Sequence, residues 1–412
     1  MKIGVAAMTL QTAQDFTKAG VARYTASIVE AFVQMRDTPH EFHLFLLPTL
    51  DVPEHWRQAP HVRLHRTWKA YNKWNLILGG IESNRLGLDF WFSTAHTVPL
   101  MGRAKKGVMI HDLFPLRYPE MFPEDQLGFY RRMMPRTCRV CDILFANSED
   151  TKRDIVDLFG NDPNRILVTP LGPGNVIAPR PASSVTDEEL AKALTPQPPL
   201  PAAEKHGTSA SESGEAGRLS SHATREGEPV GGRYLLTLST LEPRKNLAGL
   251  VKALDILRSD PIFADVRLMV AGGKGWKYQH VFDLVETLGM QDAVRFLGYV
   301  PDESLPALFA RCEAYVCASI TEGFGMPVLE AMIAGAPIVA SNGGAIPEVA
   351  GDLARYFNPT DPADIARALR EQLLSNDRDQ KISAGFQRAK QFTWERCAQL
   401  TIEGIERAVQ GG

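Results

Sequence analysis

The chain has 412 residues, of which 44% are apolar and 23% charged, a composition typical of a globular enzyme with two or three domains. A formal net charge of -3 gives no overall basic field, so we expect no nucleic-acid partner. The first residues, MKIGVAAMTLQTAQ, predict a strand rather than a signal peptide, and no run of 18 apolar residues predicts a membrane span.

Five cysteines are an odd number, which is typical of free thiols in a reducing compartment and favours a cytoplasmic protein. Cys138 and Cys141 form a C-x-x-C motif, but Cys312 and Cys317 are spaced differently and do not supply the second pair of a structural zinc site. We therefore expect buried small side chains, with a metal or redox role as the alternative.

Strand-like and helix-like segments alternate through residues 1–174, a pattern typical of parallel sheets built from β-α-β units. The predicted strands are 2–8, 41–48, 88–95, 106–112, 142–148 and 164–172, and the predicted helices are 20–35 and 124–140.

A second series of the same kind occupies residues 233–390. Its predicted strands are 234–240, 266–273, 294–300, 314–319, 337–341 and 354–357, and its predicted helices are 246–258, 278–289, 303–311 and 327–335. The fold class is therefore α/β, with two Rossmann-like, doubly wound domains.

Residues 175–232 separate the two series and are rich in Pro, Gly, Ser, Ala and Glu. Such a composition has too few apolar residues to offset the entropy of ordering. We expect a disordered insertion in the hinge between the domains, except for a short helix at 186–194; a functional tether is the alternative.

The stretch SITEGFGMPVLEAMIAGAPIVAS, residues 319–341, places glycines and a proline between Glu322 and Glu330. The glycines allow close approach of backbone N–H groups, and Pro327 suits the start of a helix, whose free N–H groups bind anions such as phosphate. We expect Glu330, in the first turn, to bind a ribose diol and Glu322 to bind hydroxyls. Alternatively, Glu330 complements the helix dipole and Glu322 is a loop charge.

Two further predicted strands end in polar residues. LEPRKN places Arg244 and Lys245 after the strand 234–240, where two cations could bind a diphosphate, and Asn246 is a candidate helix cap. The alternative is a solvated basic turn. His111 and Asp112 follow the strand 106–112; a lone histidine there is usually structural, but this one is expected to face a cleft between the domains.

Two other motifs predict no cofactor or metal. VAGGKGW, with Gly272, Gly273 and Gly275, is neither G-x-G-x-x-G nor a P-loop. Asp377 and Asp379 form a D-x-D, but they stand at an expected helix start, where acids cap the helix and complement its dipole.

The segment HVRLHRTWKAYNKWNLILGG, residues 61–80, mixes basic and aromatic residues, a composition typical of an interfacial anchor on an anionic membrane surface. The alternative is a solvated helix that makes aromatic core contacts.

Taken together, these motifs resemble the family 4 retaining glycosyltransferases of the GT-B fold, which use nucleotide-sugar donors. The resemblance covers nearly the whole chain outside the insertion. It rests on the E-x7-E spacing of Glu322 and Glu330, and on NGGAIPEVAG, LEPRKN, VAGGKGW, RFLGYVPDESL, HDLFPLRYPEMF and GVARYTASIVEAF in the family order.

The resemblance implies a role for each motif. Arg244 and Lys245 bind the donor diphosphate, Glu322 binds sugar hydroxyls and His111 faces the transferred sugar, so these four form the catalytic set. The implied donor-binding residues are Gly298, Tyr299, Val300, Gly323, Phe324, Gly325, Met326, Pro327, Val328 and Glu330. The implied acceptor-side loop is Gly20, Val21, Ala22, Arg23 and Tyr24, and the last helix, 391–412, is expected to pack back on the first domain.

The expected function is metal-independent, retaining transfer of a hexose to an acceptor hydroxyl in polysaccharide or glycolipid assembly. The expected acceptor is a carbohydrate or a lipid-linked molecule. The N-terminal segments resemble mannosyltransferases of polysaccharide assembly, and this resemblance favours GDP-mannose as the donor; no other cofactor is expected. The alternatives are a nucleotide-sugar epimerase on the same fold and an inactive module that only binds a sugar nucleotide.

Overall fold

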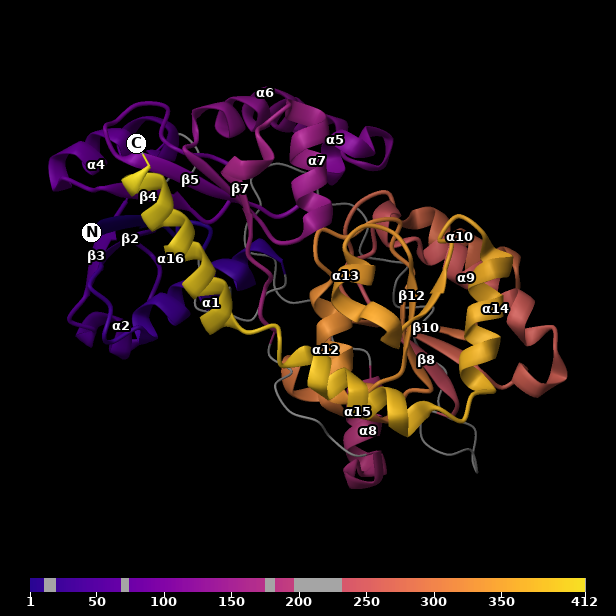
Figure 1. The fold of residues 1–412 in the computed structure, drawn as a ribbon. Helices are drawn as coiled ribbons and strands as arrows, with labels where there is room; N and C mark the ends of the chain where they lie inside the picture. The colour runs from indigo at the N-terminus through magenta and orange to yellow at the C-terminus, as the bar shows by residue number, and fades with distance from the viewer. Residues whose placement is uncertain (11–19, 68–73, 175–181, 196–231, 412) are drawn as a thin grey trace. The chain divides into compact units, whose positions relative to one another are not determined.

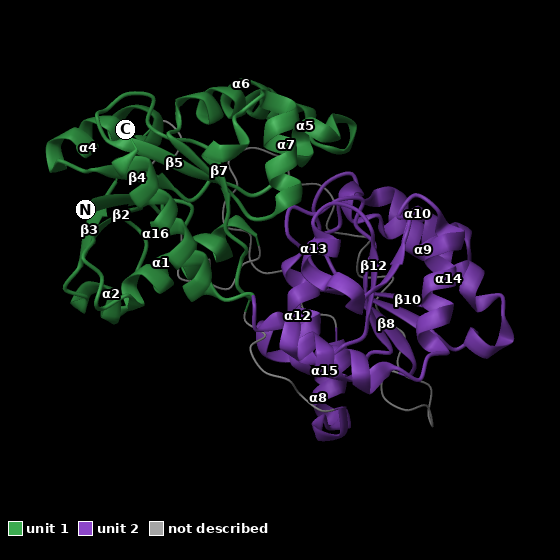
Figure 2. Cartoon of the chain, viewed as in Figure 1, with its two compact units in different colours: residues 1–174, 392–412 green, residues 175–391 purple. Residues whose placement is uncertain are grey.

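The computed structural model describes residues 1–10, 20–67, 74–174, 182–195 and 232–411 (Figure 1). The chain divides into two compact units: unit 1 comprises Met1–Gly174 and Phe392–Gly412, and unit 2 comprises Asn175–Gln391 (Figure 2). The prediction of a disordered insertion at 175–232 falls mostly outside the described residues. Inside them, helix α8 spans Asp187–Leu194, begins with a capping box between Thr186 and Glu189, and packs on helix α11 (Leu305–Arg311).

The described residues of unit 1 contain a seven-stranded parallel sheet in the order β3-β2-β1-β4-β5-β6-β7. Most of its strands are buried along their length, as expected for strands covered by helices on both faces. The strands are β1 (Lys2–Ala6), β2 (Glu41–Leu46), β3 (Val62–Arg66), β4 (Phe90–Ser93), β5 (Lys105–Ile110), β6 (Ile143–Ala146) and β7 (Ile166–Val168).

Helices connect and cover this sheet. Helix α7 begins at a serine, Ser148, whose hydroxyl accepts from the Thr151 N–H, and α6 begins with two acids that suit the helix dipole. The helices of unit 1 are α1 (Val21–Gln34), α2 (Glu54–Gln58), the π-helix η2 (Trp74–Leu78), α4 (Gly79–Leu86), α5 (Phe114–Arg117), η3 (Pro119–Met121), α6 (Glu124–Val140), α7 (Glu149–Phe159), η4 (Pro163–Arg165) and α16 (Trp394–Gln410).

The last helix, α16, packs on α1 and on strands β5 and β6 of unit 1. Thr393 caps it by accepting from the Arg396 N–H, and the Trp394 indole donates to the Pro173 carbonyl at 2.7 Å. A Cβ on Gly404 would meet the Phe145 ring at 2.7 Å, so a glycine allows the close approach of helix and sheet.

The described residues of unit 2 contain a six-stranded parallel sheet in the order β10-β9-β8-β11-β12-β13. Its apolar side chains and those of α9 and α14 form one continuous core. The strands are β8 (Tyr234–Leu238), β9 (Arg267–Ala271), β10 (Val294–Gly298), β11 (Ala314–Cys317), β12 (Ile338–Ser341) and β13 (Arg355–Phe357).

The helices of unit 2 follow the same alternation, and several begin at a capping side chain, such as Asp361 before α14. They are η5 (Ala182–Ser184), α8, η6 (Pro243–Lys245), α9 (Leu247–Arg258), η7 (Pro261–Phe263), α10 (Gln279–Thr287), η8 (Asp302–Ser304), α11 (Leu305–Arg311), α12 (Met326–Ala334), α13 (Ile346–Ala350), η9 (Gly351–Leu353), α14 (Pro362–Leu373) and α15 (Arg378–Ala389).

In each sheet the strand order reverses direction once, between β1 and β4 in unit 1 and between β8 and β11 in unit 2. At such a switch point the two following loops leave in opposite directions and open a crevice at the carboxyl edge of the sheet, where ligands of open α/β folds bind. The predicted fold class, two doubly wound α/β domains, is confirmed.

The segment 61–80 differs from the prediction. Residues 62–66 form the edge strand β3 rather than a helix, and the Arg66 guanidinium donates to the carbonyls of Leu47 and Leu50. Trp74 is buried among core aromatic side chains, because its ring packs against those of Phe45 and Trp91. The described part of this segment therefore does not present an aromatic anchor, and residues 68–73 lie outside the described residues.

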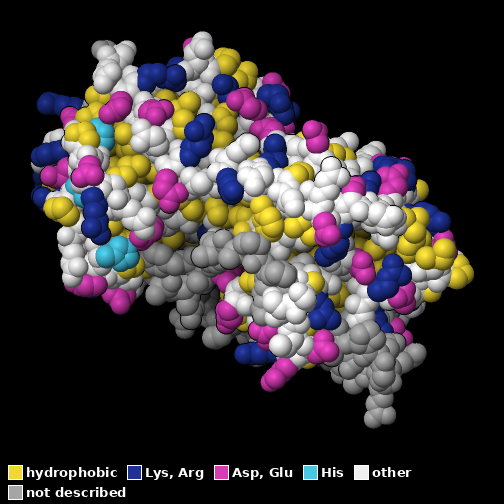
Figure 3. Space-filling model, turned by 60° about the horizontal axis from the view of Figure 1, so that its bottom comes forward, with side chains coloured by type: hydrophobic (Ala, Val, Ile, Leu, Met, Phe, Trp, Pro, Cys, Tyr) yellow, Lys and Arg dark blue, Asp and Glu magenta, His cyan; other side chains and the backbone are white. Residues whose placement is uncertain are grey.

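The remaining motifs have structural partners. All five cysteines lie in the described part of the chain, where they are buried free thiols, and burial raises the pKa of Cys138 to about 12. Asp377 accepts from Arg355 at 2.8 Å and stands before α15. Lysines and arginines mix with acids on the face drawn in Figure 3. Within the described residues, no helix is long and apolar enough to cross a bilayer.

Candidate active site

The loop after β8 carries the two predicted diphosphate ligands. Pro243, Arg244 and Lys245 form the short helix η6, so the two cations sit at the carboxyl end of β8. Asn246 precedes α9 with φ 53°, but its amide donates to the Pro359 carbonyl at 2.6 Å instead of capping the helix. The predicted cap is therefore wrong, and Asn246 instead ties this loop to the loop after β13.

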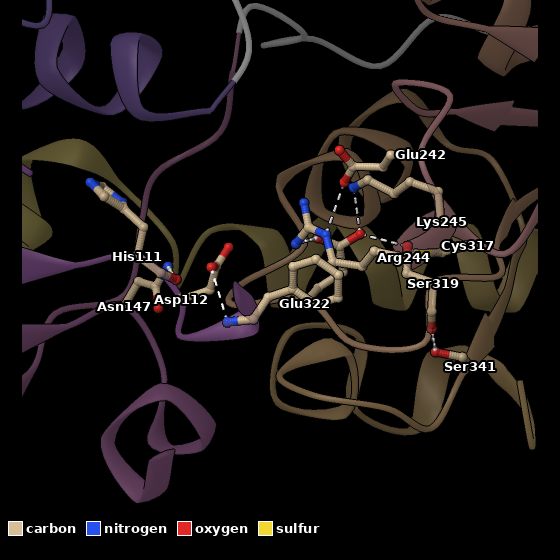
Figure 4. A network of polar contacts seen from close by, with 11 residues as sticks. His111, Asp112, Asn147, Glu242, Arg244, Lys245, Cys317, Ser319, Glu322 and Ser341 are labelled. Atoms are coloured by element: carbon tan, nitrogen blue, oxygen red, sulfur yellow. Dashed lines mark hydrogen bonds and ion pairs between the residues drawn. The ribbon is translucent and has the colours of Figure 1, made fainter. Parts of the chain in front are cut away.

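The loop after β11 brings Glu322 to the same place (Figure 4). The Lys245 ammonium lies 2.6 Å from Glu322 Oε1, and an Arg244 guanidinium nitrogen lies 3.2 Å from Glu322 Oε2. Ser319 donates its hydroxyl to Glu322 at 2.6 Å, and Arg244 also contacts Glu242 at 3.0 Å. Two cations and two carboxylates thus form one compact, charge-balanced group at the switch point of unit 2.

The charge of Glu322 is fixed by these contacts. Burial alone would raise the pKa of this carboxyl, but the positive charges of Lys245 and Arg244, together with the hydrogen bonds from Lys245 and Ser319, lower it to about 2. Glu322 is therefore ionised throughout the ordinary pH range. Its negative charge offsets the repulsion between the two neighbouring cations.

The loop that begins at the end of β12 supports the Glu322 loop, and the sequence alone did not assign this role to its residues. The Ser341 hydroxyl at the end of β12 donates to the Ser319 carbonyl at 2.6 Å, and the Ala345 N–H donates to the Glu322 carbonyl at 2.9 Å. A Cβ on Gly343 would lie 2.1 Å from the Ile320 carbonyl oxygen. The NGG run after a predicted strand was the signal that could have identified this support.

Helix α12 starts at Met326, immediately after Gly325, which has φ 93°. This left-handed conformation is one that glycine adopts readily, so Gly325 turns the chain into the helix. Pro327 lies in the first turn, as predicted, but Glu330 is the fifth helical residue and lies in the second turn. Glu330 is also buried, so complementing the helix dipole from the first turn is not its role.

The remaining members of the predicted donor set lie on neighbouring loops. Phe324 and Val328 are buried, and Gly323 lies between Glu322 and Phe324. Gly298, with φ 68°, ends β10 at the edge of the sheet; Tyr299 is half-buried and Val300 is buried. Between β8 and β10, Gly272 and Gly275 of VAGGKGW allow their loop to pack against the backbone of Ser239 and Leu241.

In unit 1, His111 follows β5. Its Nε2 donates to the Thr94 carbonyl at 2.8 Å, and the Asn147 amide donates to the His111 carbonyl at 2.8 Å. The Tyr24 ring lies edge-on to the imidazole, with 4.7 Å between the centroids. Burial lowers the pKa of His111 to about 4, so the ring is neutral near pH 7 and donates from Nε2.

The predicted acceptor-side loop is only partly a loop. Gly20 precedes α1 with φ 77°, but Val21, Ala22, Arg23 and Tyr24 form the first turn of the helix. Arg23 and Tyr24 are buried, because this turn lies beneath α16, with the Tyr24 and Trp394 centroids 5.9 Å apart. The loop that the resemblance implied is therefore wrong for residues 21–24, whereas the helix predicted at 20–35 is confirmed.

The described residues contain no group of three or more His, Cys, Asp or Glu side chains that could hold a metal ion. The positive charge at the switch point of unit 2 comes from Arg244 and Lys245. Such a site can bind an anion and stabilise negative charge that develops on it.

Two family models match this chain, one in each unit. The model described as "Glycosyl transferases group 1" matches residues 221–388, and the model "Glycosyltransferase Family 4" matches residues 19–172. The chain belongs to this family of glycosyltransferases, and the predicted resemblance is confirmed.

Curated relatives include mannosyltransferases. The O-antigen chain mannosyltransferase B of Escherichia coli is 30% identical over 299 residues, which cover 72% of this chain and 68% of that protein. The serotype-specific mannosyltransferase WbdA of Escherichia coli is 34% identical over 180 residues, which cover 43% of this chain and 22% of WbdA.

Solved structures share the fold. Anabaena Alr3699/HepE in complex with UDP and glucose superposes with a TM-score of 0.65 and 17% identity, covering 98% of this chain and 99% of that one. Sucrose-phosphate synthase from Thermosynechococcus elongatus gives a TM-score of 0.69 and 17% identity, with both chains fully covered. The predicted GT-B architecture is thereby confirmed.

We expect Glu322→Gln to lower the free energy of unfolding by about 3–5 kcal/mol, because it leaves two partly buried cations without their shared, buried carboxylate. Denaturant unfolding of the full chain measures the change. The matched control is Glu303→Gln, an exposed residue that should change stability by less than about 0.5 kcal/mol. A Glu322→Gln protein as stable as the control would contradict the charge-balancing role.

We expect His111 to make the fold acid-sensitive. Its pKa is about 4 in the folded chain against 6.5 as the ordinary value, so the unfolded chain takes up the proton first as the pH falls. The stability from neutral His111 is complete above about pH 6.5 and is lost towards pH 4, at up to about 1.4 kcal/mol per pH unit.

His111→Gln keeps a donor for the Thr94 carbonyl but does not titrate, so it should flatten the fall in stability relative to wild type. Denaturation midpoints measured from pH 7 to 4 test this, and exposed His280→Gln serves as the control that keeps the wild-type slope. Parallel curves for wild type and His111→Gln would refute the assignment.

Proposed function

We propose that this glycosyltransferase moves a hexose from a nucleotide-diphosphate sugar to an acceptor hydroxyl and retains the anomeric configuration. The observation that carries the proposal is the group formed by Arg244, Lys245 and Glu322 beside the start of α12. It places fixed positive charge at the switch point of a doubly wound sheet, where a ligand diphosphate would bind.

The charges of this group suit a leaving diphosphate. As the sugar departs, negative charge accumulates on the phosphate oxygens, and donors held in place stabilise it without reorganising. Glu322 fixes Lys245 and Arg244 from one side, and the three N–H donors of the lysine ammonium allow further contacts. We infer that these cations do the work of a divalent metal, so that transfer is metal-independent.

The mechanism we favour is front-face transfer. The acceptor hydroxyl bonds to the anomeric carbon on the face that the diphosphate leaves, and a phosphate oxygen takes the hydroxyl proton. Glu322 is a poor covalent nucleophile, because its oxygens accept from Lys245, Arg244 and Ser319 and its pKa is about 2. Because the Nε2–H of neutral His111 donates to the Thr94 carbonyl, its Nδ1 can accept one hydrogen bond from a hydroxyl of the transferred sugar.

We propose mannose as the sugar and GDP-mannose as the donor, with a carbohydrate or lipid-linked acceptor in polysaccharide or glycolipid assembly. The similarity to an O-antigen chain mannosyltransferase and to the mannosyltransferase WbdA supports this choice. Thermal-shift measurements against a panel of GDP and UDP sugars test the donor without an acceptor, because a bound donor stabilises the folded chain.

We expect transfer to continue in excess EDTA, and Arg244→Ala or Lys245→Ala to lower kcat roughly 10²-fold, by analogy with removing one oxyanion donor. Glu330→Ala should chiefly raise the KM for the donor, because contacts to the nucleoside change little during transfer. Radiolabelled transfer assays with and without Mg²⁺ measure these effects. Exposed Arg57→Ala is the control.

Activity that EDTA abolishes and Mg²⁺ restores would overturn the metal-independent mechanism. Undiminished kcat in Arg244→Ala would remove Arg244 from the site. NMR of the initial product reports its anomeric configuration, and inversion would contradict retention.

We also propose that unit 1 contacts an anionic membrane surface. An apolar patch is formed by residues of η2, α4 and the loop before β5, with exposed fractions between 36% and 61%: Ile77, Leu78, Ile81, Leu100 and Met101. The patch is continuous, because the Leu100 N–H donates to the Leu76 carbonyl at 3.1 Å and Gly80 lies against the Met101 carbonyl. Exposed apolar side chains gathered in this way are typical of interaction sites.

Basic residues near the apolar patch favour an anionic bilayer as its binding partner. Exposed Arg132, Arg136 and Arg139 follow one face of α6 and make no ion pair within the described residues. Lys106 links this arginine row to the patch, because its ammonium donates to the Gly102 carbonyl and its backbone pairs with Asp142, two residues after α6. Each basic residue near an anionic surface contributes about 1 kcal/mol of attraction.

We expect the chain to co-sediment with phosphatidylglycerol vesicles at low salt, less at high salt, and not with phosphatidylcholine vesicles. Met101→Asp with Ile81→Asp should abolish binding, whereas Ile262→Asp, an equally exposed change in unit 2, should not. No sedimentation at low salt would refute the proposal. A dimer that Met101→Asp dissociates would assign the patch to a second copy of the chain instead.

A further inference from the structure

The loop after β4 lies at the switch point of unit 1, in the position that the Glu322 loop occupies in unit 2. Hydrogen bonds hold its start: the Thr94 hydroxyl donates to the Ala6 carbonyl at 2.9 Å, and the Thr25 hydroxyl donates to Thr94 at 3.0 Å. The His111 ring donates to the Thr94 carbonyl from the neighbouring strand end. Hydrogen bonds from neighbouring elements therefore hold this loop, as they hold the Glu322 loop of unit 2.

His96 occupies the middle of this loop in a strained conformation. Its φ is 52°, and the Thr97 N–H donates to the Ala95 carbonyl at 2.7 Å, which closes a three-residue turn around it. Turns with a positive φ at the central residue are rare and cost free energy for a residue other than glycine. Such strain persists only where neighbouring contacts impose it.

Asn75 of the π-helix η2 imposes this conformation. Its side chain is fully buried, and its amide nitrogen lies 2.6 Å from the Thr97 carbonyl oxygen and 3.1 Å from the Thr97 hydroxyl. The same nitrogen lies 3.4 Å from the Ser93 hydroxyl at the end of β4. One buried amide thus joins both sides of the turn and fixes the backbone that carries His96.

The neighbours of His96 are hydrogen-bonding and aromatic groups. The Tyr130 ring of α6 lies edge-on to the imidazole with 5.6 Å between the centroids. Burial lowers the pKa of His96 and raises that of Tyr130 to about 12, and the nearby Asp112 carboxylate raises both. Near pH 7 the set therefore offers a neutral imidazole, a phenol and a carboxylate, and His96 itself remains half-buried.

We propose that His96, Asp112 and Tyr130 form a subsite for the acceptor of the transfer reaction, and that Asn75 is its positioning residue. This inference rests on the proposed transferase function. A carboxylate and an imidazole bind the hydroxyls of a neutral sugar, and an aromatic ring packs against its C–H face. None of the three side chains offers a positive charge, so the subsite accepts an uncharged pyranoside rather than a sugar phosphate.

Donor binding and hydrolysis are measured first, so that a failure of the proposed transferase function can be distinguished from a failure of the proposed acceptor subsite. Calorimetry with GDP-mannose measures donor binding, and release of free mannose measures hydrolysis in the absence of an acceptor. Transfer is then assayed to octyl α-mannoside, octyl α-glucoside, octyl α-galactoside and mannose 6-phosphate. If the wild type binds and hydrolyses the donor but transfers to none of the neutral octyl glycosides, the neutral-sugar subsite is overturned.

The variant His96→Gly separates the loss of a hydrogen-bonding side chain from the relief of backbone strain. Glycine adopts φ 52° readily, so the variant should unfold at the same temperature as wild type or higher, while its KM for the best neutral acceptor rises about tenfold or more. Donor affinity, measured by calorimetry, should stay at the wild-type value. Tyr130→Phe, which removes only the hydroxyl, should raise the same KM less.

Asn75→Ala tests the positioning role. It should raise the acceptor KM about as much as His96→Gly and leave donor affinity unchanged, and it should add little to the effect in the double variant. The control is Thr67→Val, a buried hydroxyl elsewhere in unit 1 that donates to the Leu46 carbonyl. It should lower stability without a change in acceptor KM. An unchanged acceptor KM in a folded His96→Gly protein would overturn the subsite.

Discussion

The group of charges around Glu322 is the constraint on which the switch point of unit 2 depends. Arg244 and Lys245 are adjacent in sequence and half-buried, so without a counter-charge they would repel each other and lose hydration. Glu322 supplies that charge from a different strand. The same contacts join the loop after β8 to the loop after β11. One buried carboxylate therefore neutralises the two cations and also links the two loops at the switch point.

The strand order of the two sheets explains where the polar residues of the candidate sites lie. In a doubly wound sheet, only the two strands at the reversal of order send their loops apart, and the crevice between those loops has room for a ligand. In unit 2 these strands are β8 and β11, which carry the cations and Glu322. In unit 1 they are β1 and β4, and β4 leads directly to His96. The same reversal of strand order therefore places two cations and a carboxylate in unit 2 and His96 in unit 1.

The alternation of apolar segments predicted the two sheets because buried parallel strands and their covering helices have distinct periods. Arg244 and Lys245 were found because they follow a predicted strand, and Glu322 because it precedes glycines and a proline at a predicted helix start. The sequence could not reveal that Asn246 binds Pro359 or that Asn75 binds Thr97, because these contacts link residues 113 and 22 positions apart. His96 was missed because a histidine in a loop has no periodic signal, and its strain exists only in the folded backbone.

Helix α16 belongs to unit 1, although the whole of unit 2 lies between them in the chain. During synthesis, unit 2 is a continuous segment that can close its core once residue 391 has emerged from the ribosome. Unit 1 must wait for residues 392–411, and until then the side of α1 and β6 that α16 covers stays exposed. Unit 1 is therefore synthesised first but completes its fold last, so its apolar surface stays exposed to aggregation for longer than that of unit 2.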